Sequence, residues 1–246
     1  MNCKITRYMP LDKFLAFLTN GLFVPSVKIL GDDKWEGLLI LRKVKKESRA
    51  NYMAMFRTVS QWVYVSCWHK EDQESYGMWK IYGRDANAIA IQTTTDKLKE
   101  AYRKSQQNTL AYLDDVVYLN PSNPDLLQIP FGRNVISRFA DRMTNLFPII
   151  LAFFVKHNAY EFEKEVRLVA LDKDYNENES KGNKNSKKNI LIDWKKVPDF
   201  IESIRLSPSA ETWFRNIVKD ILEKYDIAAP IVESDLEAPD VVFSES

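Results

Sequence analysis

Residues 160–171 read YEFEKEVRLVAL, a charged run that passes into a β-branched apolar run without a turn signal. As a strand, this stretch would place alternate side chains on two faces. The apolar set facing a core would be Val166, Leu168 and Ala170. The charged set on the other face would be Glu163, Glu165 and Arg167. Two carboxylates at i and i+2 can be aimed at one substrate, which is a usable catalytic geometry. The alternative is an exposed face on which glutamate and arginine neutralise one another.

Composition and charge exclude several classes of protein. The chain has 246 residues, of which 45% are apolar and 12% aromatic, and this suits a single domain over 1–246. Lys and Arg number 35 and Asp and Glu 34, giving a net charge of +1. Such a balance gives no global attraction to nucleic acid or to an anionic membrane, so any such binding must be local.

Several familiar site and targeting signals are missing from the sequence. Its two cysteines and two histidines are Cys3, Cys67, His69 and His157, too few for the paired ligands of a structural zinc site, so we expect no metal. The seven glycines form neither a GxGxxG nor a P-loop run. No apolar run approaches a membrane span of about 18 residues, and MNCKITRYMP lacks the apolar core of a signal peptide. We expect a cytoplasmic protein without a membrane partner.

Strand and helix signals alternate irregularly along the chain, which indicates an α+β fold with mixed, mainly antiparallel sheets and flanking helices. Strands are predicted over 3–9, 22–26, 61–68, 86–92, 109–119, 163–171, 189–194, 202–206 and 229–234, with 109–119 as one strand or as two separated by a bulge. Helices are predicted over 10–20, 38–57, 75–83, 94–105 and 133–157, the last kinked at Pro148. A final helix after Ser207-Pro208 would bury Trp213, Ile217, Ile221 and Tyr225 along one side.

Two polar segments are predicted to lie outside the packed core. Residues 172–188, DKDYNENESKGNKNSKK, are of low complexity and mixed charge, which is typical of a long mobile loop. Residues 235–246 carry acidic side chains and no basic one, so we expect a frayed tail.

A basic cluster interleaved with aromatic residues precedes the 61–68 strand. Its members are Arg42, Lys43, Lys45, Lys46 and Arg49, with Tyr52 and Phe56 close by. Such a cluster could hold the phosphates of RNA or DNA. The alternative is the solvated face of a helix.

Several pieces of the chain together resemble the bacterial family catalogued as domain of unknown function 2971. They are ITRYMPLDKFLAFLTNGLFVPS, GDDKWEG, YVSCWHKEDQESYGMWKIYG, AYEFEKEVRLVAL and IRLSPSAETWFRNIV, in the family's order from residue 5 to about 234. The sequence departs from the family at Lys34, where a proline is usual, and around Asn87-Ala88, where a glycine usually precedes the strand.

The layout of that family in turn looks like that of ADP-ribosyltransferases. Those proteins carry an Arg or His on an opening strand, a Ser or Tyr on a middle strand and a catalytic Glu, often as ExE, on a late strand. The matching positions are Arg7, Ser66 and Glu163-Lys164-Glu165. The resemblance implies an NAD-dependent transferase that moves ADP-ribose to nucleic acid or protein, as a bacterial toxin or antiviral defence effector does, with a neutralising antitoxin-type protein as a partner.

These residue types suit the chemistry of NAD cleavage. Breaking the nicotinamide–ribose bond builds positive charge on the ribose, as in glycoside cleavage, and a fixed carboxylate such as Glu165 would stabilise that charge. Glu163 would then face the acceptor. Ser66 would hold Glu165 or the ribose, and Arg7 would suit the NAD phosphates or ribose. The rings that could stack on nicotinamide belong to Tyr8, Trp68 and Trp79.

Four alternatives to this role remain at the level of sequence. The chain could be a non-catalytic ligand-binding or sensor module on the same fold. Cys67 could be a nucleophile with His69 or His157 as its base. Singly, Arg7 could be an exposed charge, Ser66 a satisfied strand hydroxyl and the aromatic residues plain core. Arg167, on the same face as Glu165, could also neutralise that carboxylate.

Overall fold

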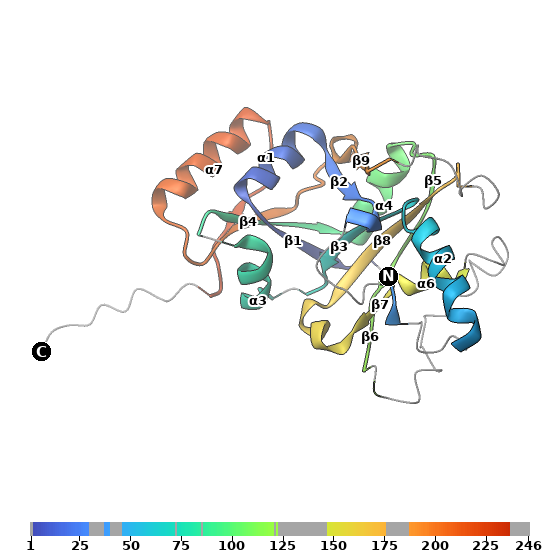
Figure 1. Cartoon of the computed structure of the whole chain (residues 1–246). Coiled ribbons are helices and arrows are strands. Elements are labelled where there is room, and N and C mark those ends of the chain that lie inside the picture. The colour runs from blue at the N-terminus through green and yellow to red at the C-terminus, as the bar shows by residue number, and fades with distance from the viewer. Residues whose placement is uncertain are drawn as a thin grey trace, which may run out of the picture.

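The computed structural model describes residues 2–29, 37–39, 46–71, 73–84, 86–120, 122, 147–175 and 187–236. Within them, seven strands form one sheet in the order β11-β10-β4-β1-β3-β8-β5 (Figure 1). Its neighbouring strands run antiparallel except β10 and β11. Two smaller pairs are β2 with β9, antiparallel, and β6 with β7, parallel. The predicted α+β class with a mainly antiparallel mixed sheet is confirmed.

The elements have the following bounds. The strands are β1 Lys4–Pro10, β2 Leu22–Pro25, β3 Val63–His69, β4 Ala88–Thr94, β5 Thr109–Asp115, β6 Val117–Leu119, β7 Val155–His157, β8 Glu165–Asp172, β9 Asn189–Ile192, β10 Ser203–Leu206 and β11 Ile231–Val232. The α-helices are α1 Leu11–Asn20, α2 Arg49–Val59, α3 Tyr76–Met78, α4 Thr95–Lys104, α6 Phe147–Ala152 and α7 Thr212–Lys224. The 3-10 turns are η1 Val27–Ile29, η3 Lys46–Ser48, η5 Asn158–Glu163 and η6 Trp194–Lys196, and η4 Trp79–Gly83 is a π-helix.

Local signals set both ends of α1 and the start of α4, close to the predicted bounds 10–20 and 94–105. Pro10, at φ −72°, precedes α1, and Gly21 ends it at φ 97°, a conformation that favours glycine. A Cβ on Gly21 would also lie 2.8 Å from the carbonyl oxygen of Ile192. The Thr94 hydroxyl caps α4 by accepting from the Lys97 amide at 3.3 Å.

The two faces of the sheet carry separate cores. Helices α1, α4 and α7 cover one face, where Phe14, Leu98 and Phe214 join the largest apolar cluster (Figure 1). Helices α2 and α6 cover part of the other face, where Phe56 and Ile150 join a second cluster. A smaller third cluster is formed by Tyr8, Met78, Trp79, Ala88 and Ala90.

The sheet is weakly joined between β1 and β3. Thr6 and His69 are the one register pair of these two strands, whereas β1 shares seven pairs with β4, and β3 shares seven with β8. The two halves of the sheet therefore diverge from this point. His69 lies at the junction.

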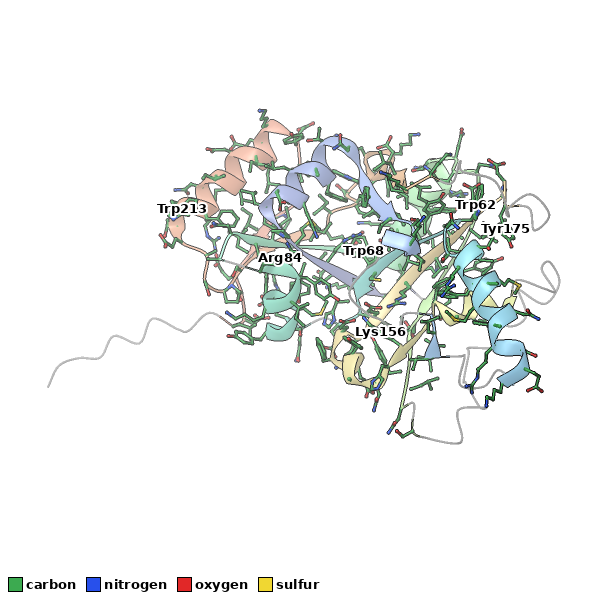
Figure 2. All side chains as sticks on the ribbon, in the orientation of Figure 1. Trp62, Trp68, Arg84, Lys156, Tyr175 and Trp213 are labelled. Atoms are coloured by element: carbon green, nitrogen blue, oxygen red, sulfur yellow. The ribbon has the colours of Figure 1, made fainter. Side chains whose placement is uncertain are left out.

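Three element predictions are wrong. Residues 155–157 form strand β7 where a helix was expected. Of the rest of the predicted 133–157 helix, 133–146 lie outside the described residues, and α6 includes Pro148. Helix α7 begins at Thr212, after a turn that follows Ser207, and buries Phe214, Val218 and Leu222. Trp213 and Ile217 of the predicted face are instead 49% and 40% exposed, and Figure 2 shows Trp213 on the outside of α7. Glu163 ends η5 and is not part of the 163–171 strand.

Other predictions fall partly outside the described residues. The 109–119 segment forms two strands, β5 and β6, in different sheets. Of the expected loop 172–188 and tail 235–246, the structure describes only 172–175 with 187–188, and 235–236. Among the described helices, none combines the length and the apolar character that a bilayer crossing requires.

Candidate functional site

The first residues of β8 meet the last residues of β3. Glu165 is paired across the strands with His69, and Arg167 with Cys67. Directly opposed residues of antiparallel strands lie on the same face, so all four side chains share one face of the sheet. The predicted common face of Glu165 and Arg167 is confirmed, although it is buried and not exposed: Glu165 is 5% and Arg167 2% exposed.

Lys164 turns the backbone between the two glutamates. Its φ of 40° and ψ of 54° are left-handed, so the chain leaves η5 and enters β8 through a sharp reversal. This reversal brings the carboxylate of Glu163 to the same site as that of Glu165, since the ammonium of Lys156 contacts both. The two carboxylates meet as predicted, but through a left-handed residue and not through strand alternation.

The left-handed backbone at Lys164 predicts a stability effect. Lys164→Gly should stabilise the protein by up to about 1 kcal/mol, because glycine adopts this conformation without steric cost and the surface pair of Lys164 with Glu71 is worth little. Lys164→Val should destabilise it by about 1–2 kcal/mol, because a β-branched residue is strained there. Urea unfolding of both variants beside wild type checks the order. Equal stability of the two variants would contradict it.

Four charges are buried together at this site. Glu163 and Glu165 carry the negative charges, and Lys156 and Arg167, at 6% and 2% exposure, the positive ones. The Arg167 Nε lies 2.5 Å from Glu165 Oε2, and its Nη1 donates to the Phe153 carbonyl at 2.7 Å. The Lys156 ammonium lies 3.4 Å from Glu165 Oε1, near η5 in Figure 2. Burying two carboxylates is tolerable because each has a cationic partner.

Two tyrosine hydroxyls add to the site. The Tyr82 hydroxyl donates to Glu163 Oε1 at 2.9 Å, and the Tyr118 hydroxyl accepts from the Glu165 amide at 2.8 Å. Burial, followed by the charge of Glu163, raises the pKa of Tyr82, so this hydroxyl stays protonated. Tyr82 lies on the π-helix η4 and is 36% exposed, so it stands between Glu163 and solvent. Single π-helical turns are frequent at functional sites.

The environment pushes the pKa values of the two glutamates apart. Burial, followed by the negative charge of Glu165, raises the pKa of Glu163 to about 7. Burial alone would also raise the pKa of Glu165, but Arg167 and Lys156 outweigh it and hold this pKa below its ordinary value. Near neutral pH, Glu165 is thus a fixed anion while Glu163 can take up or release a proton. Carboxyl pairs separated in this way divide the acid/base roles of a site.

The raised pKa of Glu163 predicts a pH-dependent stability. A carboxyl that titrates near 4.3 when unfolded and near 7 when folded stabilises the fold at low pH, and this contribution is lost as the pH rises through about 7. Glu163→Gln removes the titration. As the pH rises from 4.5 to 8, the unfolding free energy of the variant should therefore increase relative to that of wild type by about 2–3 kcal/mol. Urea unfolding of both proteins across this range measures the difference, and parallel curves would show that Glu163 does not titrate there.

Arg7, Ser66 and Trp68 lie on the opposite face of the sheet. Arg7 Nη1 donates to the Ser66 hydroxyl at 2.9 Å, and Trp68 Nε1 donates to the same oxygen at 3.0 Å. Trp68 belongs to the large core beneath α1, and Figure 2 shows its position in β3. Ser66 pairs with Leu168 in the register, so it faces away from Glu165. The prediction that Ser66 contacts Glu165 is wrong, because alternation along β3 gives that face to Cys67 and His69.

Tyr8 and Trp79 do lie on the Glu165 face. The Tyr8 ring packs edge-on against Trp79 at 4.8 Å and against His69 at 6.0 Å. Trp79 Nε1 donates to Glu74 at 2.9 Å. Both rings are buried, and Tyr8 is the one of the two that contacts His69.

The remaining candidates have other roles or lie outside the described residues. His157 Nδ1 accepts from the Ala159 amide at 3.0 Å and begins η5. His69 Nδ1 is bonded to the Glu163 carbonyl, so this nitrogen is not available as a base for Cys67. Of the basic cluster, Lys46 and Arg49 are exposed, whereas Arg42, Lys43 and Lys45 lie outside the described residues.

Sequence reasoning missed three members of the site. Lys156 was assigned to an apolar helix, and no pattern marked Tyr82 or Tyr118 as neighbours of the glutamates.

No group of three His, Cys, Asp or Glu side chains could hold a metal ion in the described residues, which are 2–29, 37–39, 46–71, 73–84, 86–120, 122, 147–175 and 187–236.

Comparison with known proteins finds one family. Residues 78–168 match the family described as "Protein of unknown function (DUF2971)". The matched segment runs from the end of α3 into β8 and includes Tyr82, Lys156, Glu163, Glu165 and Arg167. The resemblance predicted from the sequence is confirmed over this segment. No curated protein and no solved structure matches the chain.

Proposed function

We propose a function from the geometry of the site, because residues 78–168 match the DUF2971 family, whose description names no activity. The chain is an NAD-dependent ADP-ribosyltransferase. It cleaves the nicotinamide–ribose bond of NAD and transfers ADP-ribose to a macromolecule, either nucleic acid or protein. The observation that carries this proposal is the buried pair Glu163 and Glu165, whose pKa values are shifted in opposite directions.

Glu165 supplies the negative charge that this bond cleavage needs. As nicotinamide departs, positive charge develops on the ribose, and an anion already held in place stabilises it without reorganisation. Arg167 donates a hydrogen bond to the Glu165 carboxylate, and the Tyr118 hydroxyl accepts one from the Glu165 backbone amide. The ion pairs reduce its net charge, yet they keep it ionised and fix its position.

Glu163 acts on the acceptor. With a pKa near 7 it can remove the proton from an attacking hydroxyl, amide or amine. The bond from ribose C1′ to nicotinamide nitrogen breaks, the bond from C1′ to the acceptor atom forms, and the acceptor's proton goes to Glu163. Nicotinamide leaves neutral, and the proton is later released to solvent.

The face of the sheet on which each predicted NAD-binding residue lies reduces the number of residues that could contact NAD. Tyr8 and Trp79 share the Glu165 face and can contribute rings to the nicotinamide side. Arg7, Ser66 and Trp68 face the opposite core, so the proposal gives them no contact with a ligand bound at Glu165.

Two exposed basic residues bear on the class of the acceptor. Lys46 and Arg49 are exposed cations that could draw a nucleic acid, and a salt-dependent affinity lost on reversing their charges would support that acceptor. A toxin or antiviral defence role in the cytoplasm, with a neutralising partner protein, is part of the same proposal.

A second function is favoured by one observation. Lys156 and Arg167 together offset the charge of Glu165, and a fully paired carboxylate is what a non-catalytic binding or sensor module would retain. Such a module would bind a ligand without consuming it.

Nicotinamide release from NAD, followed by proton NMR on wild-type protein, tests the proposal. The reaction is run with and without cell extract as a source of acceptor. Release that extract accelerates is the expected result. No release from folded protein under both conditions would overturn the transferase and favour the binding module, whether or not NAD is bound.

A further inference from the structure

The imidazole of His69 is buried beside the two glutamates with one nitrogen engaged. Its side chain is 0% exposed, and Nδ1 lies 2.6 Å from the Glu163 carbonyl oxygen. A carbonyl can only accept a hydrogen bond, so Nδ1 carries the proton and donates. In the neutral ring this fixes Nε2 as an acceptor.

That acceptor has no hydrogen-bond partner in the described part of the chain. Glu71 Oε2 lies 3.6 Å from it, which is too long for a hydrogen bond, and this oxygen is itself an acceptor. Buried polar atoms are normally satisfied, so an orphaned acceptor in a candidate site marks a place where a donor is missing.

The orphaned nitrogen lies where the ribose half of NAD would be bound. His69 and Glu165 are directly opposed in the register, and the β-carbons of such residues are about 4.5–5.5 Å apart. Tyr8, a candidate ring for the nicotinamide side, packs against the same imidazole. A ligand group that reaches Nε2 therefore lies close to the carboxylate that would stabilise the ribose.

We propose that His69 Nε2 accepts a hydrogen bond from a donor on the nicotinamide riboside half of NAD. The proposal rests on the proposed function and names a residue that binds substrate at that site. Two groups supply the shared chemistry: the N–H of the nicotinamide carboxamide and a hydroxyl of the adjoining ribose. Both are uncharged hydrogen-bond donors, and Nε2 can accept from either.

A ligand that reaches Nε2 from the side of Glu71 would displace that side chain. Glu71 lies over the nitrogen with its side chain 32% exposed, held by the 51% exposed Lys164. Exposed ion pairs of this kind contribute little free energy, so a ligand can move Glu71 aside at small cost.

Two substitutions separate the two nitrogens of His69. In His69→Asn the amide nitrogen can still donate to the Glu163 carbonyl, while the acceptor at Nε2 is lost. His69→Gln can place an amide oxygen near the Nε2 position and keep an acceptor there. NAD affinity measured by isothermal titration calorimetry should fall roughly tenfold in His69→Asn and less in His69→Gln.

An NAD analogue with an acetyl group in place of the carboxamide identifies the donor. It has no N–H at that position. If the carboxamide is the donor, wild type should bind the analogue roughly tenfold more weakly than NAD, and His69→Asn should bind both alike. If wild type does not discriminate while His69→Asn is still weakened for NAD, the ribose hydroxyl is the donor.

The outcomes distinguish this inference from the proposed function. Wild type that binds NAD and releases nicotinamide, with a folded His69→Asn of unchanged affinity, overturns the role of His69 alone. Wild type that does not bind NAD overturns both. Should His69→Asn fail to fold, the same titrations with NAD and the analogue on His69→Leu, which also lacks an acceptor at that position, decide the role in its place.

Discussion

Glu165→Gln is expected to lower nicotinamide release from NAD by about 10²–10³-fold, the loss that follows removal of one preorganised electrostatic group. Glutamine keeps the shape of the side chain and can still accept from Arg167, but it lacks the charge that the developing ribose cation requires. The affinity for NAD should change much less, because the charge matters chiefly in the transition state. Initial rates and calorimetric affinities of wild type and variant measure the two effects.

The matched control for Glu165→Gln is Glu202→Gln. Glu202 is 28% exposed and pairs with Lys97, away from the carboxylate cluster. Glu202→Gln should therefore release nicotinamide at the wild-type rate. Should the buried glutamine prevent folding, Glu165→Asp keeps the charge but withdraws it by one methylene, and a loss of about 10–100-fold is expected. A folded Glu165 variant with the wild-type rate would remove this residue from the mechanism.

Arg167→Met should destabilise the protein by about 3–5 kcal/mol, because it leaves the buried Glu165 with one cation where it had two. The bond from Arg167 to the Phe153 carbonyl is lost at the same time. Breaking a buried pair by removing one partner is costly since the remaining charge loses part of its compensation. Urea unfolding at pH 7 gives the difference in free energy.

The double variant Arg167→Met/Glu165→Gln separates charge from packing. Removing the carboxylate charge as well should restore about half of the lost stability, whereas additive losses would show that the ion pair is not the source of the effect. Arg215→Met is the surface control. Arg215 pairs with Glu233, which is 68% exposed, so a change of less than about 1 kcal/mol is expected.

How far the sequence predicts this fold depends on the range of the interactions involved. The strand at β3 and the helix ends at Pro10 and Gly21 follow from local propensity and backbone conformation, and they are confirmed. The prediction of which face of α7 is buried is wrong, because Trp213 and Ile217 fit an amphipathic pattern as well as Phe214 and Val218 do. Which of two neighbouring stripes is buried depends on how the helix lies on the sheet.

The candidate site shows the same division. The sequence predicts that Glu163, Glu165 and Arg167 lie together, because they are close in the chain. It does not predict that Ser66 and Glu165 face opposite sides, because that depends on the register of β3 against β8. Lys156 and Tyr82 join the glutamates from segments with no local signal, and only the folded chain brings them together.

Transfer of labelled ADP-ribose is the most direct test of the proposed reaction. Wild type and Glu165→Gln are incubated with cell extract and NAD labelled in its adenine ring, and the label in acid-insoluble material is measured before and after protease or nuclease. Label incorporated by wild type alone, and released by one of the two digestions, is the predicted result. Equal label with both proteins, or none from a wild type that is folded and binds NAD, would contradict the assignment of Glu165 as the residue that drives transfer.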